Sequence, residues 1–197
     1  MEKILTDNDY LNSLAAEAYK QAKVTGWHRD LHSKEHYLCL IISELMEAVQ
    51  ADRVDRTADL LAFKDCYDFA IMQDQLTGID ADHAYIKWYN KYVKDCLEDE
   101  LADACIRIFD MAGYMGIRLD ICKDTVVHKE FSFTENIFNI TKVLAENNAS
   151  VHIGLNVALS NIIRLAELKK IVNFDEFIQL KMKYNAIRPY MHGCKKY

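Results

Sequence analysis

The sequence predicts an all-α fold, and three observations support this prediction. Among 197 residues there is one proline and there are six glycines, so helix-breaking residues are scarce. Apolar residues recur at helical spacing over long segments. Few segments alternate apolar and polar residues, as half-buried strands do. We therefore expect a helical bundle, and the length suits a single domain spanning residues 1–197.

Four helices are expected in the first part of the chain. Gly26 ends the first and Gly78 follows the third, because glycine readily adopts the left-handed backbone found after a helix. Ser33 is a candidate N-cap of the second helix. The fourth starts near Asp80 or Asp82, and charged residues between 95 and 99 could break it. The expected ranges are about 8–25, 33–52, 56–76 and 80–116.

The second part of the chain is expected to hold one irregular stretch followed by three helices. Residues 118–133 show no helical pattern, and TVVHKEFSF within them could include a short extended piece. The last helix ends before Pro189, because the residue that precedes a proline avoids the α-helical region. The three expected ranges are about 134–147, 151–170 and 175–187.

Composition and charge exclude several classes of function. The formal net charge is −6, which opposes a general role in binding nucleic-acid polymers. The N-terminal segment resembles no signal peptide, and no stretch reaches 18 uncharged apolar residues, so we expect no membrane association. The six cysteines form no C-x-x-C motif, and most lie in apolar helical patterns, which is typical of reduced thiols in the cytoplasm.

Two pairs of carboxylates lie inside apolar helical segments. Glu44 and Glu47 interrupt YLCLIISELMEAV, and Glu100 and Asp103 have the same spacing in ELADACIRIFDMAGYMGI. Residues three apart share one helix face. Spacing alone decides nothing, because 30 acidic residues in this chain give roughly 4 to 5 such pairs by composition. The apolar surroundings separate these two pairs from the others, which lie among charged residues.

The second segment also fits a solvated helix face. Glu100, Asp103, Arg107 and Asp110 fall on one stripe about 80° wide, and Asp103 and Arg107 are spaced as a surface ion pair. The first segment is harder to place on an open surface, because Ser43 is almost the only polar residue beside its two glutamates.

If the two helices pack together, the four carboxylates converge. Two like charges 4 Å apart repel by roughly 4 kcal/mol at an effective dielectric constant near 20, so the cluster must bind a cation or keep protons. Carboxylate oxygens favour Mg²⁺ or Mn²⁺. A di-iron site is disfavoured, because its Glu-x-x-His motif does not occur in the chain.

Two further features are candidates for binding a nucleotide. Trp27 follows a helix end, where an indole can stack on a base, although a tryptophan there also serves as a core residue. KMKYNAIRPYMHGCKKY, at 181–197, gathers basic residues that include Lys181 and Arg188. Such a run is either a solvated helix end or a set of groups that neutralise phosphates beside a metal.

Four blocks of the sequence together resemble the MazG-like branch of the all-α nucleoside triphosphate pyrophosphohydrolases. In chain order they are NSLAAEAYKQAKVTGWHRD, LIISELMEAVQADR, ELADACIRIFDMAGYMGIRLD and KMKYNAIRPYMHG. The resemblance implies a helical core that presents its carboxylates to Mg²⁺. It also implies attack of water on a nucleoside triphosphate, with a monophosphate and pyrophosphate as products.

The resemblance assigns roles to individual residues. It implies that Glu44, Glu47, Glu100 and Asp103 are the metal ligands, with Glu47 also orienting water. Lys181, Asn185 and Arg188 match the basic motif and would contact phosphate or sugar. A homodimer or a higher homo-oligomer is implied as well, and the amphipathic, aromatic segment YIKWYNKYV at 85–93 is a candidate for the subunit interface or for a cover of the site. The chain departs from the family pattern in the 52 residues between Glu47 and Glu100 and in RPYMHG, which replaces RRHPHVF.

Three functional hypotheses follow. The first is Mg²⁺-dependent hydrolysis of ribo- or deoxyribonucleoside triphosphates. The second is a nucleotide-binding or regulatory helical module without appreciable turnover. The third is a structural helical oligomer whose acidic stripes face solvent. Metal binding separates the first two from the third, and turnover separates the first from the second.

Overall fold

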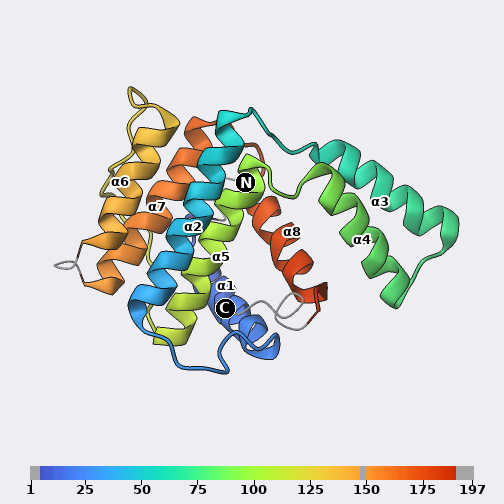
Figure 1. Ribbon diagram of the computed structural model, residues 1–197, viewed down its shortest axis with the longest axis horizontal. Coiled ribbons are helices and arrows are strands. Elements are labelled where there is room, and N and C mark those ends of the chain that lie inside the picture. Colours follow the sequence, from blue (N-terminus) through green and yellow to red (C-terminus); the bar gives the residue numbers. More distant parts are fainter. Residues whose placement is uncertain (1–4, 147–149, 190–197) are drawn as a thin grey trace.

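The computed structural model describes residues 5–146 and 150–189, and within them the chain is helical with no strand (Figure 1). The all-α prediction is confirmed. The eight helices of this part are α1 (Asn8–Val24), α2 (Lys34–Arg53), α3 (Leu60–Asp74), α4 (Gly78–Tyr92), α5 (Leu97–Met115), α6 (Phe133–Ala145), α7 (Val151–Leu168) and α8 (Phe174–Ile187).

Helix α5 forms the centre of the bundle. It packs most extensively against α1 and α2, and also against α7 and α8, while α6 lies over α2 and α7. Its side chains Leu101, Ile108 and Phe109 are completely buried and share one hydrophobic core with buried residues of α2 such as Ile41 and Leu45. Burying each such side chain contributes roughly 1.5–3 kcal/mol. This packing fixes α2 and α5 side by side.

A glycine allows α1 to approach α5 closely. A Cβ atom added at Gly113 would lie 2.6 Å from the carbonyl oxygen of Ala15 and 2.6 Å from the Cβ of Tyr19. Any larger residue would push the two helices apart. Together with the buried Ala15 and Ala18 of α1, Gly113 brings the C-terminal half of α1 against the polar stripe of α5.

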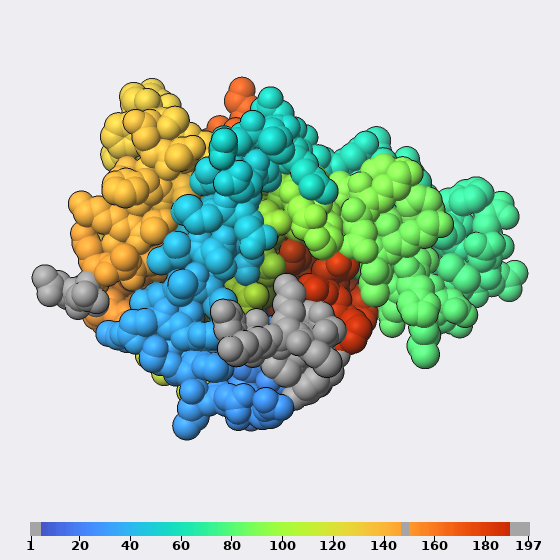
Figure 2. All heavy atoms as spheres, in the orientation of Figure 1, coloured from blue at the N-terminus to red at the C-terminus, as the bar shows by residue number. Residues whose placement is uncertain are grey.

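Helices α3 and α4 form a hairpin that projects from the bundle (Figures 1 and 2). The hairpin is attached through α4, whose Tyr85 donates a hydrogen bond of 2.8 Å to the carbonyl oxygen of Leu180 in α8. Tyr89 of α4 stacks on Tyr184 of α8 with ring centroids 4.4 Å apart. Several large apolar side chains of the hairpin are exposed, namely Leu61, Phe69, Met72 and Ile79.

The expected third helix, from Arg56 to Leu76, is shorter in the structure. Asp59 caps α3 by accepting a hydrogen bond of 2.9 Å from the backbone N–H of Ala62, so the helix begins at Leu60. The residues before the cap are held elsewhere, because the backbone N–H of Ala58 donates to Glu98. The helix ends at Asp74, since Gln75 has a left-handed backbone with φ 48°.

The expected fourth helix is two helices, and it breaks at the predicted charge cluster. Helix α4 ends at Tyr92 and α5 begins at Leu97. Asp95 between them has a left-handed backbone with φ 59°, which aspartate tolerates better than most residues. Its backbone N–H donates a hydrogen bond of 2.9 Å to the Asp99 carboxylate, which stabilises the break.

The irregular segment predicted at 118–133 spans residues 116–132, since α6 begins at Phe133, and the extended piece suggested within 125–133 is not a strand. Side chains of α7 satisfy its backbone in place of a neighbouring strand. Asn156 accepts from the N–H of Asp120, Ser160 from that of Cys122, and Asn161 from that of Val126. Asn147, the expected end of the next helix, and the basic residues after Pro189 lie outside the described residues.

Within the described ranges, no helix has both the length and the apolar character that crossing a membrane requires.

Candidate metal centre

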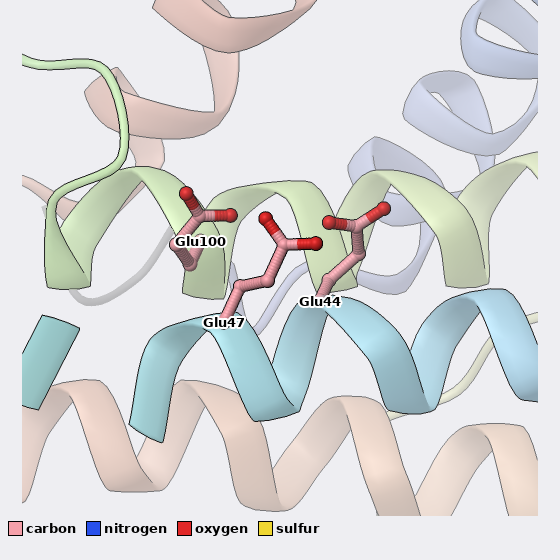
Figure 3. A group of neighbouring side chains, drawn as sticks. All are labelled: Glu44, Glu47 and Glu100. Carbon is pink, nitrogen blue, oxygen red and sulfur yellow. The ribbon is translucent and has the colours of Figure 1, made fainter. Parts of the chain in front are cut away.

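Three glutamates from two helices converge in the space between α2 and α5 (Figure 3). Glu44 and Glu47 project from α2 and Glu100 from α5, and one carboxylate oxygen of each lies within 4.8 Å of the others. The packing of α2 against α5 brings residues that are more than 50 positions apart to one point. This spacing of oxygens suits a single divalent cation after small side-chain adjustments.

Asp103, the fourth predicted ligand, lies one turn further along α5 and outside this close group. One of its oxygens lies 3.2 Å from the Lys181 ammonium, and the other is 3.5 Å from the Asn185 side-chain nitrogen. Asp103 nevertheless lines the same cavity as the three glutamates. Direct binding of a metal by Asp103 stays a prediction.

The four carboxylates open onto a cavity of about 200 Å³. Helices α1, α2, α5 and α8 and the two turns after α1 and α4 form its walls. Trp27, Lys181, Asn185 and Arg188, the residues predicted to contact a nucleotide, all line it. The remaining lining residues are Ala18, Gln21, Ala22, Thr25, Lys94, Asp95, Ile106, Arg107 and Asp110.

The buried carboxyl groups of this centre hold protons readily when no cation is present. Burial, with the nearby Asp103 carboxylate, raises the pKa of Glu44 to about 7, although Arg107 opposes the shift. Burial raises the pKa of Glu100 to about 9, and Asp99, Asp103 and Glu47 add to the effect against the attraction of Lys181. A bound divalent cation would favour the charged forms. The all-oxygen donor set fits Mg²⁺ or Mn²⁺.

Lys181 is a buried cation within the acidic cluster. Its ammonium donates a hydrogen bond of 2.9 Å to Asp99, and its side chain is only 6% exposed. Burial lowers the pKa of Lys181, but Asp103, Asp99 and Glu100 outweigh this effect, so the pKa is raised and the ammonium stays charged. An ammonium has three N–H donors, so one remains for a further acceptor after both aspartates are bound.

Asp99 is an anchor that the sequence alone did not single out. It is completely buried and accepts hydrogen bonds from the Tyr89 hydroxyl, the Lys181 ammonium and the Asp95 backbone N–H. Asp95, Asp99 and Glu100 form a second group of acidic side chains with oxygens within 4.8 Å of one another. The Lys181 ammonium already supplies a positive charge to this second group. Asp99 therefore fixes the position of Lys181.

Arg107 connects α2 and α5, the two helices that carry the three glutamates. Its Nε atom donates a hydrogen bond of 3.0 Å to Glu44 of α2, whereas the sequence spacing suggested a surface ion pair with Asp103. Burial lowers the pKa of Arg107, but Asp103 and Glu44 outweigh this effect and raise it. The guanidinium thereby holds one oxygen of Glu44 and leaves the other available to a cation.

Asn185 carries a buried side-chain oxygen that has no hydrogen-bond partner among the described residues. The amide orientation is set by Asp103, because a carboxylate oxygen needs the N–H₂ group on its side. The unpaired oxygen can therefore accept a hydrogen bond from a ligand. Arg188, at the end of α8, places its guanidinium over the Tyr184 ring, 5.3 Å from its centroid.

The chain was compared with protein-family models, with curated proteins and with solved structures, and no match was found.

Proposed function

We propose that the protein is a Mg²⁺-dependent nucleoside triphosphate pyrophosphohydrolase, as the resemblance of its four sequence blocks implies. One observation carries the proposal. The carboxylates Glu44, Glu47, Glu100 and Asp103 line one cavity together with the cationic and aromatic residues that a nucleotide requires. A bare acidic cluster would repel a triphosphate, whereas a cavity that also contains Lys181, Arg107 and Arg188 neutralises its oxygens.

In this proposal Glu44, Glu47 and Glu100 hold the cation, and Asp103 contributes from one turn away. When bound, Mg²⁺ would supply charge neutralisation of the phosphate oxygens and polarisation of the phosphorus centre. Glu47 is the exposed member of the group, so its second oxygen can accept a proton from water and orient that water. Attack at the α-phosphorus breaks the bond to the bridging oxygen between the α and β phosphates and releases pyrophosphate.

The polar groups on α8 divide the contacts between phosphate and sugar. Lys181 and Arg188 are cations and suit phosphate oxygens. The unpaired oxygen of Asn185 only accepts hydrogen bonds, so it suits a sugar hydroxyl and not a phosphate oxygen. In this proposal the sugar lies between α5 and α8.

The test is a panel of the common ribo- and deoxyribonucleoside triphosphates with Mg²⁺, in which pyrophosphate and orthophosphate are measured separately. The proposal predicts pyrophosphate and a nucleoside monophosphate in equal amounts. The variant Glu47→Gln should abolish this release and keep the fold, and Glu130→Gln, whose side chain is 65% exposed, is a matched control. Orthophosphate as the product would mean γ-phosphate cleavage and would refute the proposed chemistry.

A nucleotide-binding module without turnover is the second candidate, and one observation favours it. Asp103 is engaged by Lys181 and lies outside the close group of oxygens, so the centre has three converging carboxylates where the family pattern implies four. Tight Mg²⁺-dependent binding of nucleotides without release of either phosphate product would support this candidate.

We also propose a homodimer that uses the projecting α3–α4 hairpin. Leu61, Phe69 and Met72 on α3 and Ile79 on α4 are large apolar side chains exposed by 64% or more. Exposed apolar residues gathered on one projection are typical of a protein contact. Light scattering at micromolar concentration should give the mass of two chains, and Phe69→Glu should give the mass of one. A wild-type mass of 22.8 kDa would contradict the proposal.

A further inference from the structure

A second polar unit adjoins the cavity and is formed by Asp110, which lines the cavity, and His28, which contacts Asp110. Asp110 lies on α5, ten residues after Glu100, and lines the cavity. One of its oxygens, Oδ1, lies 2.6 Å from Nε2 of His28. The His28 side chain is 3% exposed and that of Asp110 is 12% exposed, so this contact is shielded from solvent.

Three tyrosines fix the His28 ring. Tyr37 and Tyr114 stack on it with centroids 5.7 and 4.9 Å away, and Tyr19 meets it edge-on at 5.0 Å. The Tyr37 hydroxyl lies 3.2 Å from Nδ1 of His28. Burial raises the pKa of Tyr37 to about 12, with Tyr114 and Asp110 adding to the effect, so this hydroxyl keeps its proton. In the neutral ring Tyr37 donates to Nδ1, and Nε2 carries the proton donated to Asp110.

This arrangement holds the Asp110 carboxylate in one orientation and uses only one of its oxygens. Within residues 5–146 and 150–189, no hydrogen bond reaches the other oxygen, Oδ2. The Asp110 side chain is 12% exposed and lines the cavity, so Oδ2 can accept a hydrogen bond from a ligand there. Because an ionised carboxylate only accepts hydrogen bonds, the group that binds Oδ2 is an N–H or O–H group of that ligand.

The position of Asp110 matches the base end of a nucleotide bound at the metal centre. Along the axis of α5, Asp110 lies about 10 Å from Asp103, which is seven residues earlier, and about 15 Å from Glu100, which is ten residues earlier. This is comparable to the span from the α-phosphate of a nucleotide to the far edge of its base. Trp27, which lines the same cavity, offers an indole for stacking.

Arg107 supplies the complementary group beside Asp110. The two residues are three apart on the same face of α5, and both line the cavity. The Nε atom of Arg107 binds Glu44, and the other four N–H groups of its guanidinium are also donors. The cavity wall thus presents a donor next to an acceptor.

We propose that Asp110, positioned by His28, reads the base of the nucleotide and selects bases that carry a ring N–H beside a carbonyl group. Guanine, hypoxanthine, uracil and thymine have this edge, with the N–H facing Asp110 and the carbonyl facing Arg107. Adenine and cytosine present a ring nitrogen lone pair in place of the N–H, which the carboxylate repels. This inference deepens the proposed function and rests on the binding of a nucleotide in that cavity.

The test measures binding and not turnover, so that its outcome is independent of catalysis. Titration calorimetry with Mg²⁺ and the α,β-methylene analogues of GTP, ITP, UTP, ATP and CTP gives five dissociation constants for the wild type. The first three analogues should bind at least about tenfold more tightly than the last two, because a buried polar group left unpaired is costly. Equal affinity for all five analogues overturns the inference.

Two variants at the site test the assignment of each residue. Asp110→Asn replaces an acceptor by an amide that also donates, so the preference for a ring N–H should disappear or reverse. His28→Leu should reduce the same preference, and His28→Gln, whose amide nitrogen can replace Nε2, should restore part of it. Asp124→Asn, at an exposed position outside the cavity and outside the hairpin, is the matched control. Equal weakening of all five analogues by Asp110→Asn would show a merely structural role and would overturn the inference.

The outcomes separate this inference from the proposed function. Base-selective binding without turnover keeps the inference and refutes the enzyme. Turnover with base ratios that Asp110→Asn leaves unchanged refutes the inference and keeps the enzyme. If none of the analogues binds the wild type with Mg²⁺, both are refuted. If Asp110→Asn does not fold, the five wild-type constants and His28→Gln still decide the question.

Discussion

Replacing Glu100 with glutamine should stabilise the metal-free protein at neutral and alkaline pH. Glu100 is 3% exposed, and burial raises its pKa to about 9 from an ordinary value of 4.5. Between these two values the folded chain retains a proton that the unfolded chain has released. The free energy of unfolding therefore falls as the pH rises, by about 1.4 kcal/mol for each pH unit.

The size of the effect follows from this slope. From pH 4.5 to pH 7.5 the loss attributable to Glu100 is about 4 kcal/mol, a large share of the stability of a typical domain. Glutamine cannot ionise, so Glu100→Gln should remove this contribution and raise the unfolding free energy at pH 7.5 by a similar amount. The titration of Glu44, with its pKa of about 7, remains in both proteins and cancels in the comparison.

Urea unfolding in the presence of EDTA, repeated at intervals between pH 5.5 and pH 8.5, measures the two slopes. Glu130→Gln is the control, because the Glu130 side chain is 65% exposed and lies far along the chain in the segment before α6. In a second series with Mg²⁺, the wild type should gain stability and Glu100→Gln should not, because the variant lacks a ligand. If the unfolding free energy of the wild type and of Glu100→Gln had the same pH dependence in EDTA, burial would not raise the pKa of Glu100 as described.

Three further predictions concern single positions. Asp99→Asn removes a completely buried charge from Lys181 and should lower the free energy of unfolding by about 3 kcal/mol, measured in urea; a change within experimental error would refute the anchoring role. Gly113→Ala places a Cβ 2.6 Å from the Ala15 carbonyl and should cost about 1–3 kcal/mol, whereas unchanged thermal stability would contradict the close packing of α1 on α5. Arg188→Ala should weaken the binding of α,β-methylene nucleotides far more than the binding of Mn²⁺, and equal effects in calorimetry would remove its contact with phosphate.

The fold class and the two glutamate-bearing helices could be predicted from local patterns. Apolar residues recur at helical spacing, and the apolar neighbours of Glu44 and Glu100 within short segments indicate that both are buried. Tertiary contacts decide what these patterns leave open. Arg107 has the spacing for a pair with Asp103, yet the packing of α2 against α5 brings Glu44 to its Nε atom.

Other features depend on contacts between distant parts of the chain. Asp99 lies in a run of acidic residues, a pattern typical of a solvated helix face. Its burial depends on contacts with Tyr89 and Lys181, which are distant from it in the sequence or on another helix. The start of α3 depends likewise on the hydrogen bond between Ala58 and Glu98, which no local pattern contains. For His28 and Asp110 the sequence held a partial signal, since both belong to blocks that support the family resemblance.

The most direct test of the metal centre is anomalous diffraction from crystals grown with Mn²⁺. We expect an ion between α2 and α5, with oxygens of Glu44, Glu47 and Glu100 in its coordination sphere. Glu44→Gln crystals grown in the same way should lose most of this signal. A map without an ion at that position, or with an ion held only by the second acidic group of Asp95, Asp99 and Glu100, would contradict it.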